Sequence, residues 1–182
     1  MNYEYYEKYI NKNTKDRFDT TTLFENPKVF SSLVDDLLKP FEKTRFNKIV
    51  ALDALGFILG GAAAQKLKIG LVPVRKKGKL PGIRGTVLSA SFSDYVKKGV
   101  LEMNKGSIKK DDSILIVDEW IETGGQIKAA IKLIEKQKGK VVGIATICAH
   151  RTPHTEILFK KYNCHALKEN RAEGRVCNMM LH

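Results

Sequence analysis

Residues 114–127 read ILIVDEWIETGGQI, and this stretch decides how the rest of the chain is interpreted. Its first four residues are apolar, which predicts a strand buried on both faces, as in a parallel sheet. The TGG at residues 123–125 predicts a tight turn that opens a helix. Three carboxylates lie between that strand and that turn: Asp118, Glu119 and Glu122. Charge at such a place needs a partner.

A turn that follows a parallel strand and opens a helix lies where open α/β sheets bind ligands. The hydroxyl of Thr123 and the backbone N–H groups of Gly124 and Gly125 would face an anion, most often a phosphate, at the positive end of the helix. Asp118 and Glu119 would then accept hydrogen bonds from ribose hydroxyls, or meet a divalent ion that arrives with the substrate. The alternative is a simple tight turn, with acids that only favour a helix N-terminus.

The flanking segments alternate between strand and helix patterns. Apolar runs predict strands at residues 48–52, 70–74 and 141–149, and apolar spacing predicts helices after Pro27, at residues 57–67 and from Ile127 onward. Gly139 is expected to end the last of these helices in a left-handed conformation, and residues 87–112 show no strong period. The chain is therefore predicted to be α/β, with a mostly parallel twisted sheet flanked by helices.

Composition limits the functional classes. A chain of 182 residues with 43% hydrophobic and 29% charged residues suits one globular domain. It has no bilayer-length apolar run and no apolar leader, so we expect a cytoplasmic protein without a membrane partner. The net charge of +12 comes largely from scattered lysines, which is weak support for nucleic-acid binding. Cys148, Cys164 and Cys177 match no zinc or CxxC spacing and are expected to be reduced structural thiols.

The quoted stretch resembles the phosphoribosyl diphosphate signature of type I phosphoribosyltransferases. Four further blocks resemble the adenine phosphoribosyltransferase branch, in the same order along the chain: FDTTTLFENPKVF (18–30), ALDALGFILGGAAAQKL (51–67), LVPVRKKGKLPG (71–82) and LEMN (101–104). Together they span roughly residues 17–148. This resemblance implies a single-domain fold over residues 1–182, with an N-terminal hood at about 1–25, a core at about 26–150, a flexible catalytic loop and a divergent tail at 151–182.

The resemblance also implies a reaction. Ribose 5-phosphate would pass from phosphoribosyl diphosphate to a purine base, adenine giving AMP, with pyrophosphate leaving as in purine salvage. Mg²⁺ would be carried by the substrate without a direct protein ligand, and the protein would be a homodimer. Because the transition state in this family resembles an oxocarbenium ion, catalysis would be mostly electrostatic.

Roles for individual residues follow from the same resemblance. The 5-phosphate would lie in the turn formed by Glu122, Thr123, Gly124, Gly125 and Gln126. Asp118 and Glu119 would hold the ribose hydroxyls. The pyrophosphate would meet the backbone of Asp53, Ala54, Leu55 and Gly56, with a cis peptide expected at Ala54-Leu55. Arg75 and Lys79 would supply positive charge to the diphosphate, in relatives across a dimer interface.

Several positions depart from the family pattern. Leu55 replaces an Arg of the pyrophosphate loop, and the loss of such a contact could cost ~2 to 3 kcal/mol. Glu122 replaces a small residue, so it is either a general base toward the incoming purine or a solvent-facing acid. The flexible loop contains Asp94, Tyr95 and Glu102. Glu102, near its end, is the second acid-base candidate, and Asn104 replaces the His that follows. The hood has Arg17 and Phe18 in swapped order, which leaves the accepted base open.

Two other functions remain as alternatives. The chain could be a phosphoribosyltransferase-fold regulator that binds phosphoribosyl diphosphate and nucleic acid, or a transferase for a different acceptor base. The basic charge and the loss of the loop Arg at Leu55 favour the regulator, whereas Glu102 and the KKGKLPG segment favour an enzyme. No separate DNA-reading domain is recognisable in the sequence, so nucleic acid is not the expected partner.

Overall fold

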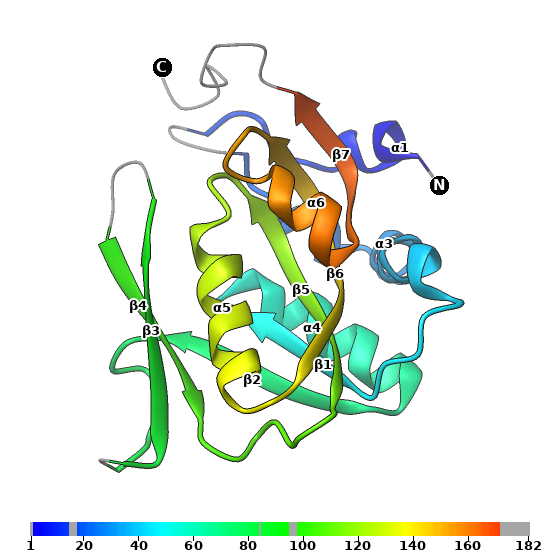
Figure 1. Cartoon of the computed structure of the whole chain (residues 1–182). Helices are drawn as coiled ribbons and strands as arrows, with labels where there is room; N and C mark the ends of the chain where they lie inside the picture. Colours follow the sequence, from blue (N-terminus) through cyan, green and yellow to red (C-terminus); the bar gives the residue numbers. More distant parts are fainter. Residues whose placement is uncertain (1, 15–17, 84, 95–97, 172–182) are drawn as a thin grey trace.

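The computed structural model describes residues 2–14, 18–83, 85–94 and 98–171, and these form a seven-stranded sheet with helices on both faces (Figure 1). The strands are β1 (Lys48–Leu52), β2 (Gly70–Lys76), β3 (Val87–Ser93), β4 (Lys98–Asn104), β5 (Ser113–Ile121), β6 (Lys140–Arg151) and β7 (Cys164–Arg171). Their order is β3-β4-β2-β1-β5-β6-β7. β2, β1, β5, β6 and β7 run parallel, whereas β4 is antiparallel to both β2 and β3. The predicted α/β class with a mostly parallel sheet is confirmed.

Helices cover the two faces of the sheet. They are α1 (Tyr3–Glu7), α2 (Thr22–Glu25), α3 (Pro27–Leu38), η1 (Lys39–Phe41), α4 (Leu55–Leu67), α5 (Gly125–Lys136) and α6 (Glu156–Tyr162). One buried cluster joins α5 and α6 to the sheet, and a second joins α1, α3 and α4 to its other face. Figure 1 shows α5 in front of the central strands and α4 behind them. The parallel strands are thus buried on both sides, as their continuous apolar runs predict.

Local sequence explains the two helices that flank the site. In α5, Ile127, Ala130, Ile131 and Ile134 are all buried, at the predicted helical spacing. In α4 the small residues allow the helix to approach β1 closely, since a Cβ added to Gly60 would lie 2.6 Å from the Cβ of Ala51. Both helices begin at the carboxyl ends of parallel strands, so their N-termini meet at one edge of the sheet.

The structure differs from the sequence prediction in three places. β5 continues to Ile121, so Asp118 and Glu119 belong to the strand itself and not to the turn. Residues 87–93 and 98–104 form an antiparallel pair of strands, whose partly exposed residues show no clear apolar period because cross-strand pairing defines them. The left-handed residue after α5 is Lys138, with φ 65°, and not Gly139. The amide of Gly139 instead donates to the carbonyl of Ile134 at 3.1 Å.

The segment after β6 continues the same sheet. α6 leads into β7, which pairs in parallel with β6 at the edge of the sheet. The division into hood, core and tail therefore stays a prediction, since one sheet runs from Lys48 to Arg171. Cys148 and Cys164 are buried free thiols, and burial raises the pKa of Cys164 to about 12.

Some sequence predictions concern residues outside the described ranges. These are Arg17 of the hood, Tyr95 of the flexible loop and Cys177 of the tail. Across the residues that the structure does describe, no helix has both the length and the apolar character needed to cross a membrane.

Candidate active site at the carboxyl edge of the sheet

The turn at residues 122–126 joins β5 to α5. Gly124 is the N-cap of α5 and has φ 72°, a left-handed conformation that favours glycine. A Cβ at this position would also lie 3.0 Å from Cδ1 of Leu158, so no side chain fits. The N-cap Gly124 has no side chain to cap the helix, and the hydroxyl of Thr123 accepts the N–H of Gly125 at 3.2 Å. The next backbone N–H groups have no intrahelical partner, as at the start of any helix. The turn can therefore offer several N–H donors and the positive end of α5 to an anion.

The pyrophosphate loop predicted at residues 53–56 lies directly beside the acids of β5. A Cβ added to Gly56 would lie 3.0 Å from the carbonyl oxygen of Val117 and 3.1 Å from Oδ1 of Asp118. Asp118 is only 7% exposed, and its Oδ1 accepts a hydrogen bond from the backbone N–H of Glu119 at 2.9 Å. The start of α4 and the end of β5 are therefore closely packed, and a side chain at residue 56 would crowd them.

The loop has a cis peptide, but one position earlier than predicted. The cis bond joins Asp53 to Ala54, whereas we expected it between Ala54 and Leu55. Leu55 is already the first residue of α4 in the structure, so the bond after Ala54 leads directly into the helix. The N–H of Phe57 in the first turn of α4 donates to the carbonyl oxygen of Ala54 at 3.1 Å. The N–H groups of Leu55 and Gly56, which precede it, have no acceptor within the helix and could face a ligand.

Arg75, Lys79 and Glu102 form a second group beside the same loop. Nε of Arg75 lies 3.5 Å from Oδ2 of Asp53, and its Nη1 donates to the carbonyl oxygen of Lys79 at 2.7 Å. Nε itself is buried and has no hydrogen-bond partner among the described residues. Glu102 pairs with Arg75 across β2 and β4, and its carboxylate accepts the N–H of Gly78 at 2.9 Å. The guanidinium is thus held between the carboxylate of Asp53 and the carbonyl oxygen of Lys79.

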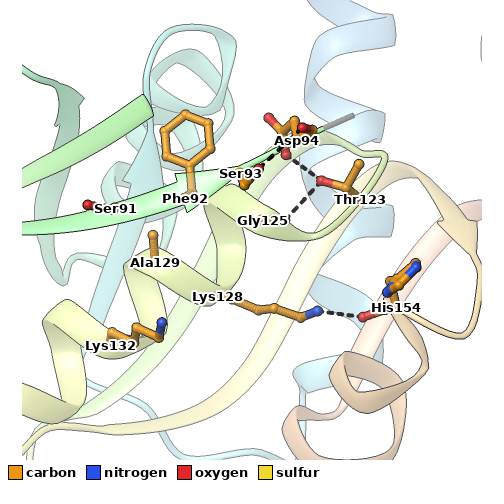
Figure 2. A pocket seen from close by; sticks show the side chains of 10 residues that line it. All are labelled: Ser91, Phe92, Ser93, Asp94, Thr123, Gly125, Lys128, Ala129, Lys132 and His154. Atoms are coloured by element: carbon orange, nitrogen blue, oxygen red, sulfur yellow. Dashed lines mark hydrogen bonds between the residues drawn. The ribbon is translucent and has the colours of Figure 1, made fainter. Parts of the chain in front are cut away.

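Two cavities open around the turn. The smaller, about 60 Å³, is lined by Asp94, Asp118 and residues 120–127. The larger, about 380 Å³, is shown in Figure 2 and is lined by Ser91, Phe92, Ser93, Asp94, Thr123, Gly125, Lys128, Ala129, Lys132 and His154. They meet at Asp94, Thr123 and Gly125. The small cavity contains the predicted phosphate turn with Glu122 and Gln126, and the larger has a basic wall along α5.

Asp94 is the residue of this site that sequence reasoning missed. The hydroxyl of Thr123 donates a hydrogen bond to Oδ1 of Asp94, and the same hydroxyl accepts the N–H of Gly125 at 3.2 Å (Figure 2). In the sequence Asp94 was noted only as part of the flexible loop. Its contact with the turn depends on how the β3–β4 hairpin packs against α5, which no local pattern encodes.

Two aromatic rings lie at the ends of β5 and β6. Trp120, which lines the smaller cavity, meets His150 edge to face with 6.0 Å between the ring centroids. Burial lowers the pKa of His150, so its imidazole is neutral at pH 7. Trp120 thus gives the smaller cavity an aromatic side chain that an apolar ring can contact.

The structure keeps the two acid-base candidates in separate groups. Glu122 is half-buried in the smaller cavity, whereas Glu102 lies on β4 with Arg75 and Gly78 and lines neither cavity described above. Within the described ranges, no three His, Cys, Asp or Glu side chains come together as a metal site. The arrangement is thus two turns at helix N-termini, with carboxylates at the end of β5 and an arginine beside Asp53.

Comparisons with known proteins agree with this geometry. The family model of the phosphoribosyl transferase domain matches residues 20–177. An adenine phosphoribosyltransferase of Cereibacter sphaeroides is 45% identical over 129 residues, which make up 71% of this chain and 71% of that protein. The crystal structure of adenine phosphoribosyltransferase from Rhodothermus marinus is 31% identical with a TM-score of 0.80, covering 92% of this chain and 98% of that chain. The Saccharomyces cerevisiae enzyme, in complex with an imino-altritol bisphosphate and adenine, is 26% identical with a TM-score of 0.75, covering 91% and 97%.

Proposed function

Because this chain belongs to the phosphoribosyltransferase family, on its adenine phosphoribosyltransferase branch, we propose that it transfers ribose 5-phosphate from phosphoribosyl diphosphate to adenine. AMP and pyrophosphate are the products of this reaction, which serves purine salvage. The contact of Gly56 with Asp118 carries the proposal, because it brings the two anion-binding turns together with a buried carboxylate between them. A donor with a phosphate at one end and a diphosphate at the other needs both turns at once.

Each part of the donor has a matching group in this proposal. The 5-phosphate binds the turn of Thr123, Gly124, Gly125 and Gln126, where backbone N–H groups and the end of α5 favour an anion. The ribose hydroxyls donate to Asp118 and Glu119 at the end of β5. The pyrophosphate binds the loop of Asp53, Ala54, Leu55 and Gly56. Such fixed donors stabilise the charge that develops on the leaving group.

Arg75 and Mg²⁺ would neutralise the negative charge of the leaving diphosphate. The Nε donor of Arg75 lies beside Asp53. Nη1 of Arg75 donates to the carbonyl oxygen of Lys79 and so holds the turn that contains Lys79. The carboxylates of Asp53 and Asp118 are hard oxygen donors of the kind that Mg²⁺ prefers, so they suit a metal ion carried in by the diphosphate. That ion would supply further neutralisation of the leaving group when bound.

Proton transfer to or from the base is assigned to Glu122 or Glu102. Glu122 shares its cavity with Trp120, whose ring offers a flat apolar surface for a purine. Glu102 is tied to the N–H of Gly78 and would act from the hairpin side. A general base must lie within hydrogen-bond reach of the proton that it moves, and this favours Glu122 if the purine stacks near Trp120. The homodimer and the cytoplasmic location stay predictions.

The test is pyrophosphate release from phosphoribosyl diphosphate and magnesium, measured with adenine, hypoxanthine, guanine, xanthine, uracil, orotate and no base. We expect release with adenine and only background with the other bases. Base-independent binding of nucleic acid that weakens steeply with salt, without any pyrophosphate release, would instead support a regulator. Release with another base alone would keep the transferase and change the acceptor.

A further inference from the structure

The end of β3 lies directly against the turn of residues 122–126, which is called the phosphate turn below (Figure 2). The Thr123 hydroxyl donates to Oδ1 of Asp94 and accepts the N–H of Gly125 at 3.2 Å. A Cβ added to Gly125 would lie 2.7 Å from Oδ1 of Asp94 and 2.7 Å from the carbonyl oxygen of Ser93. No space is left between the first residue of α5 and the end of the strand.

Asp94 brings a negative charge to the place that suits a phosphate. It is the acidic residue that lines both cavities, and the other ionisable residues of the larger cavity are Lys128, Lys132 and His154. The positive end of a helix, a hydroxyl and backbone N–H groups are the donors with which such turns hold phosphate. The carboxylate of Asp94 already uses the hydroxyl of Thr123. A phosphate that enters the turn must therefore replace Asp94 at this contact.

From this geometry we propose that Asp94 competes with the 5-phosphate of the substrate for the phosphate turn and thereby determines which ligands can enter it. A phosphate dianion carries more charge than one carboxylate and offers three acceptor oxygens, so it can displace Asp94. A sugar without phosphate cannot. The inference rests on the proposed function, because it assumes that residues 122–126 receive a phosphorylated ribose.

Displacement of Asp94 would also affect the position of Glu102, on the other strand of the hairpin. Asp94 directly follows β3, and in this hairpin Ser89 of β3 pairs with Glu102 of β4. Glu102 in turn accepts the N–H of Gly78, in the turn that contains Lys79. Arrival of the 5-phosphate is therefore linked through one pair of strands to the acid and the cations near the diphosphate.

The test measures ribose 5-phosphate binding without magnesium, by calorimetry and by the fluorescence of Trp120, the one tryptophan of the chain. We expect Asp94→Ala to bind about three- to tenfold more tightly than the wild type, as for removal of one anionic competitor at a helix N-terminus. Asp94→Asn should show a smaller gain, because its amide oxygen can still accept from Thr123. Binding of unphosphorylated ribose should not change in either variant.

Asp111→Asn is the matched control. Asp111 is exposed, it precedes the amino end of β5, and its φ of 67° is one that asparagine tolerates. Asp111→Asn removes the same charge far from the turn, so we expect no change in the affinity for ribose 5-phosphate. Equal gains in Asp94→Asn and Asp111→Asn would reduce the effect to net charge and overturn the inference.

Other outcomes separate this inference from the proposed function. Weaker binding in the two Asp94 variants would mean that Asp94 helps to hold the ligand, which contradicts competition. Unchanged binding in both variants, in a protein that still releases pyrophosphate with adenine, would overturn the role of Asp94 and leave the proposed function intact. Absence of ribose 5-phosphate binding in every protein would overturn the phosphate turn itself, and the inference with it.

Discussion

Two ion pairs lie at the two ends of β1, and they are built differently. At the amino end, Nζ of Lys48 lies 2.6 Å from Oδ2 of Asp112, which also accepts the N–H of Lys109 at 2.7 Å. The other oxygen of Asp112 accepts from Asn47 at 2.7 Å. The carboxylate is thus satisfied from several sides within the protein.

The pair at the carboxyl end is looser. Arg75 and Asp53 approach only to 3.5 Å, and Nε of Arg75 is buried without a hydrogen-bond partner in the described part of the chain. A buried donor without a hydrogen-bond partner costs stability, so this pair contributes less to the fold than the pair of Lys48 and Asp112. The comparison teaches that the charges at the amino end of β1 are satisfied within the protein, whereas those at its carboxyl end are the ones that we propose for ligand binding.

Replacement of Arg75 should have the largest effect of four changes that test this comparison. We expect Arg75→Ala to lower kcat/KM about 100- to 1000-fold, because a preorganised donor to the leaving group is lost. The free energy of unfolding should change by less than about 1 kcal/mol, because the pair with Asp53 is long and partly exposed. Steady-state kinetics and urea unfolding measure both, with Lys76→Ala, an exposed neighbour, as control. Similar kinetic losses in both variants would remove the special role of Arg75.

The opposite outcome is expected at the amino end of the sheet. Asp112→Asn should lower the free energy of unfolding by about 2 kcal/mol, since it leaves the largely buried ammonium of Lys48 without its counter-charge. kcat/KM should stay within about threefold of the wild type, because the candidate site lies at the carboxyl ends of the strands and Asp112 lies at their amino ends. Urea unfolding of this variant beside Asp111→Asn is the measurement. A large kinetic loss in a variant that is still folded would contradict the division between the two ends.

A third change adds charge at the functional end. Leu55→Arg restores the residue that the family pattern has in the pyrophosphate loop, and Leu55 is half-buried at the start of α4. We expect kcat/KM to rise up to about tenfold through one added charge-assisted contact. Leu67→Arg, at an exposed position at the other end of α4, is the control. An unchanged or lower rate would show that this loop reaches its full effect without a local arginine.

The smallest expected effect is the pH dependence of the stability that Asp112 contributes. Burial alone would raise the pKa of Asp112, but the hydrogen bonds from Lys48, from the N–H of Lys109 and from Asn47 hold it below its ordinary value. A carboxyl with a lowered pKa stabilises the folded state above the unfolded pKa of about 3.9, and this contribution is lost as the pH falls through the folded pKa. The stability difference between wild type and Asp112→Asn should therefore be full at pH 6 and shrink below about pH 4. Unfolding at a series of pH values measures it, and a constant difference would contradict the assignment.

Much of the fold could be read from local patterns. The spacing of Ile127, Ile131 and Ile134 predicts α5, and the apolar run before Asp118 predicts β5. The TGG turn predicts where an anion would bind, and Gly124 does adopt the left-handed conformation. These features are local because the helical period and the conformational freedom of glycine act within a few residues.

The candidate site was predicted only in part, because its remaining contacts are long-range. The β3–β4 hairpin shows no clear apolar period, since its strands are held by pairing at the edge of the sheet. Asp94 is separated from Thr123 by 29 residues, and Asp112 from Lys48 by 64. Such pairs form only after strands and helices have packed.

By itself, the sequence determined the central strands and helices, the position of the TGG turn and the family resemblance, because side-chain period and turn chemistry are properties of neighbouring residues. Only the tertiary structure decided that Gly56 lies close to Asp118, that Nε of Arg75 has no hydrogen-bond partner among the described residues, and that the hydroxyl of Thr123 donates to Asp94. Those facts depend on which strand ends meet at one edge of the sheet, and a linear pattern does not carry that arrangement.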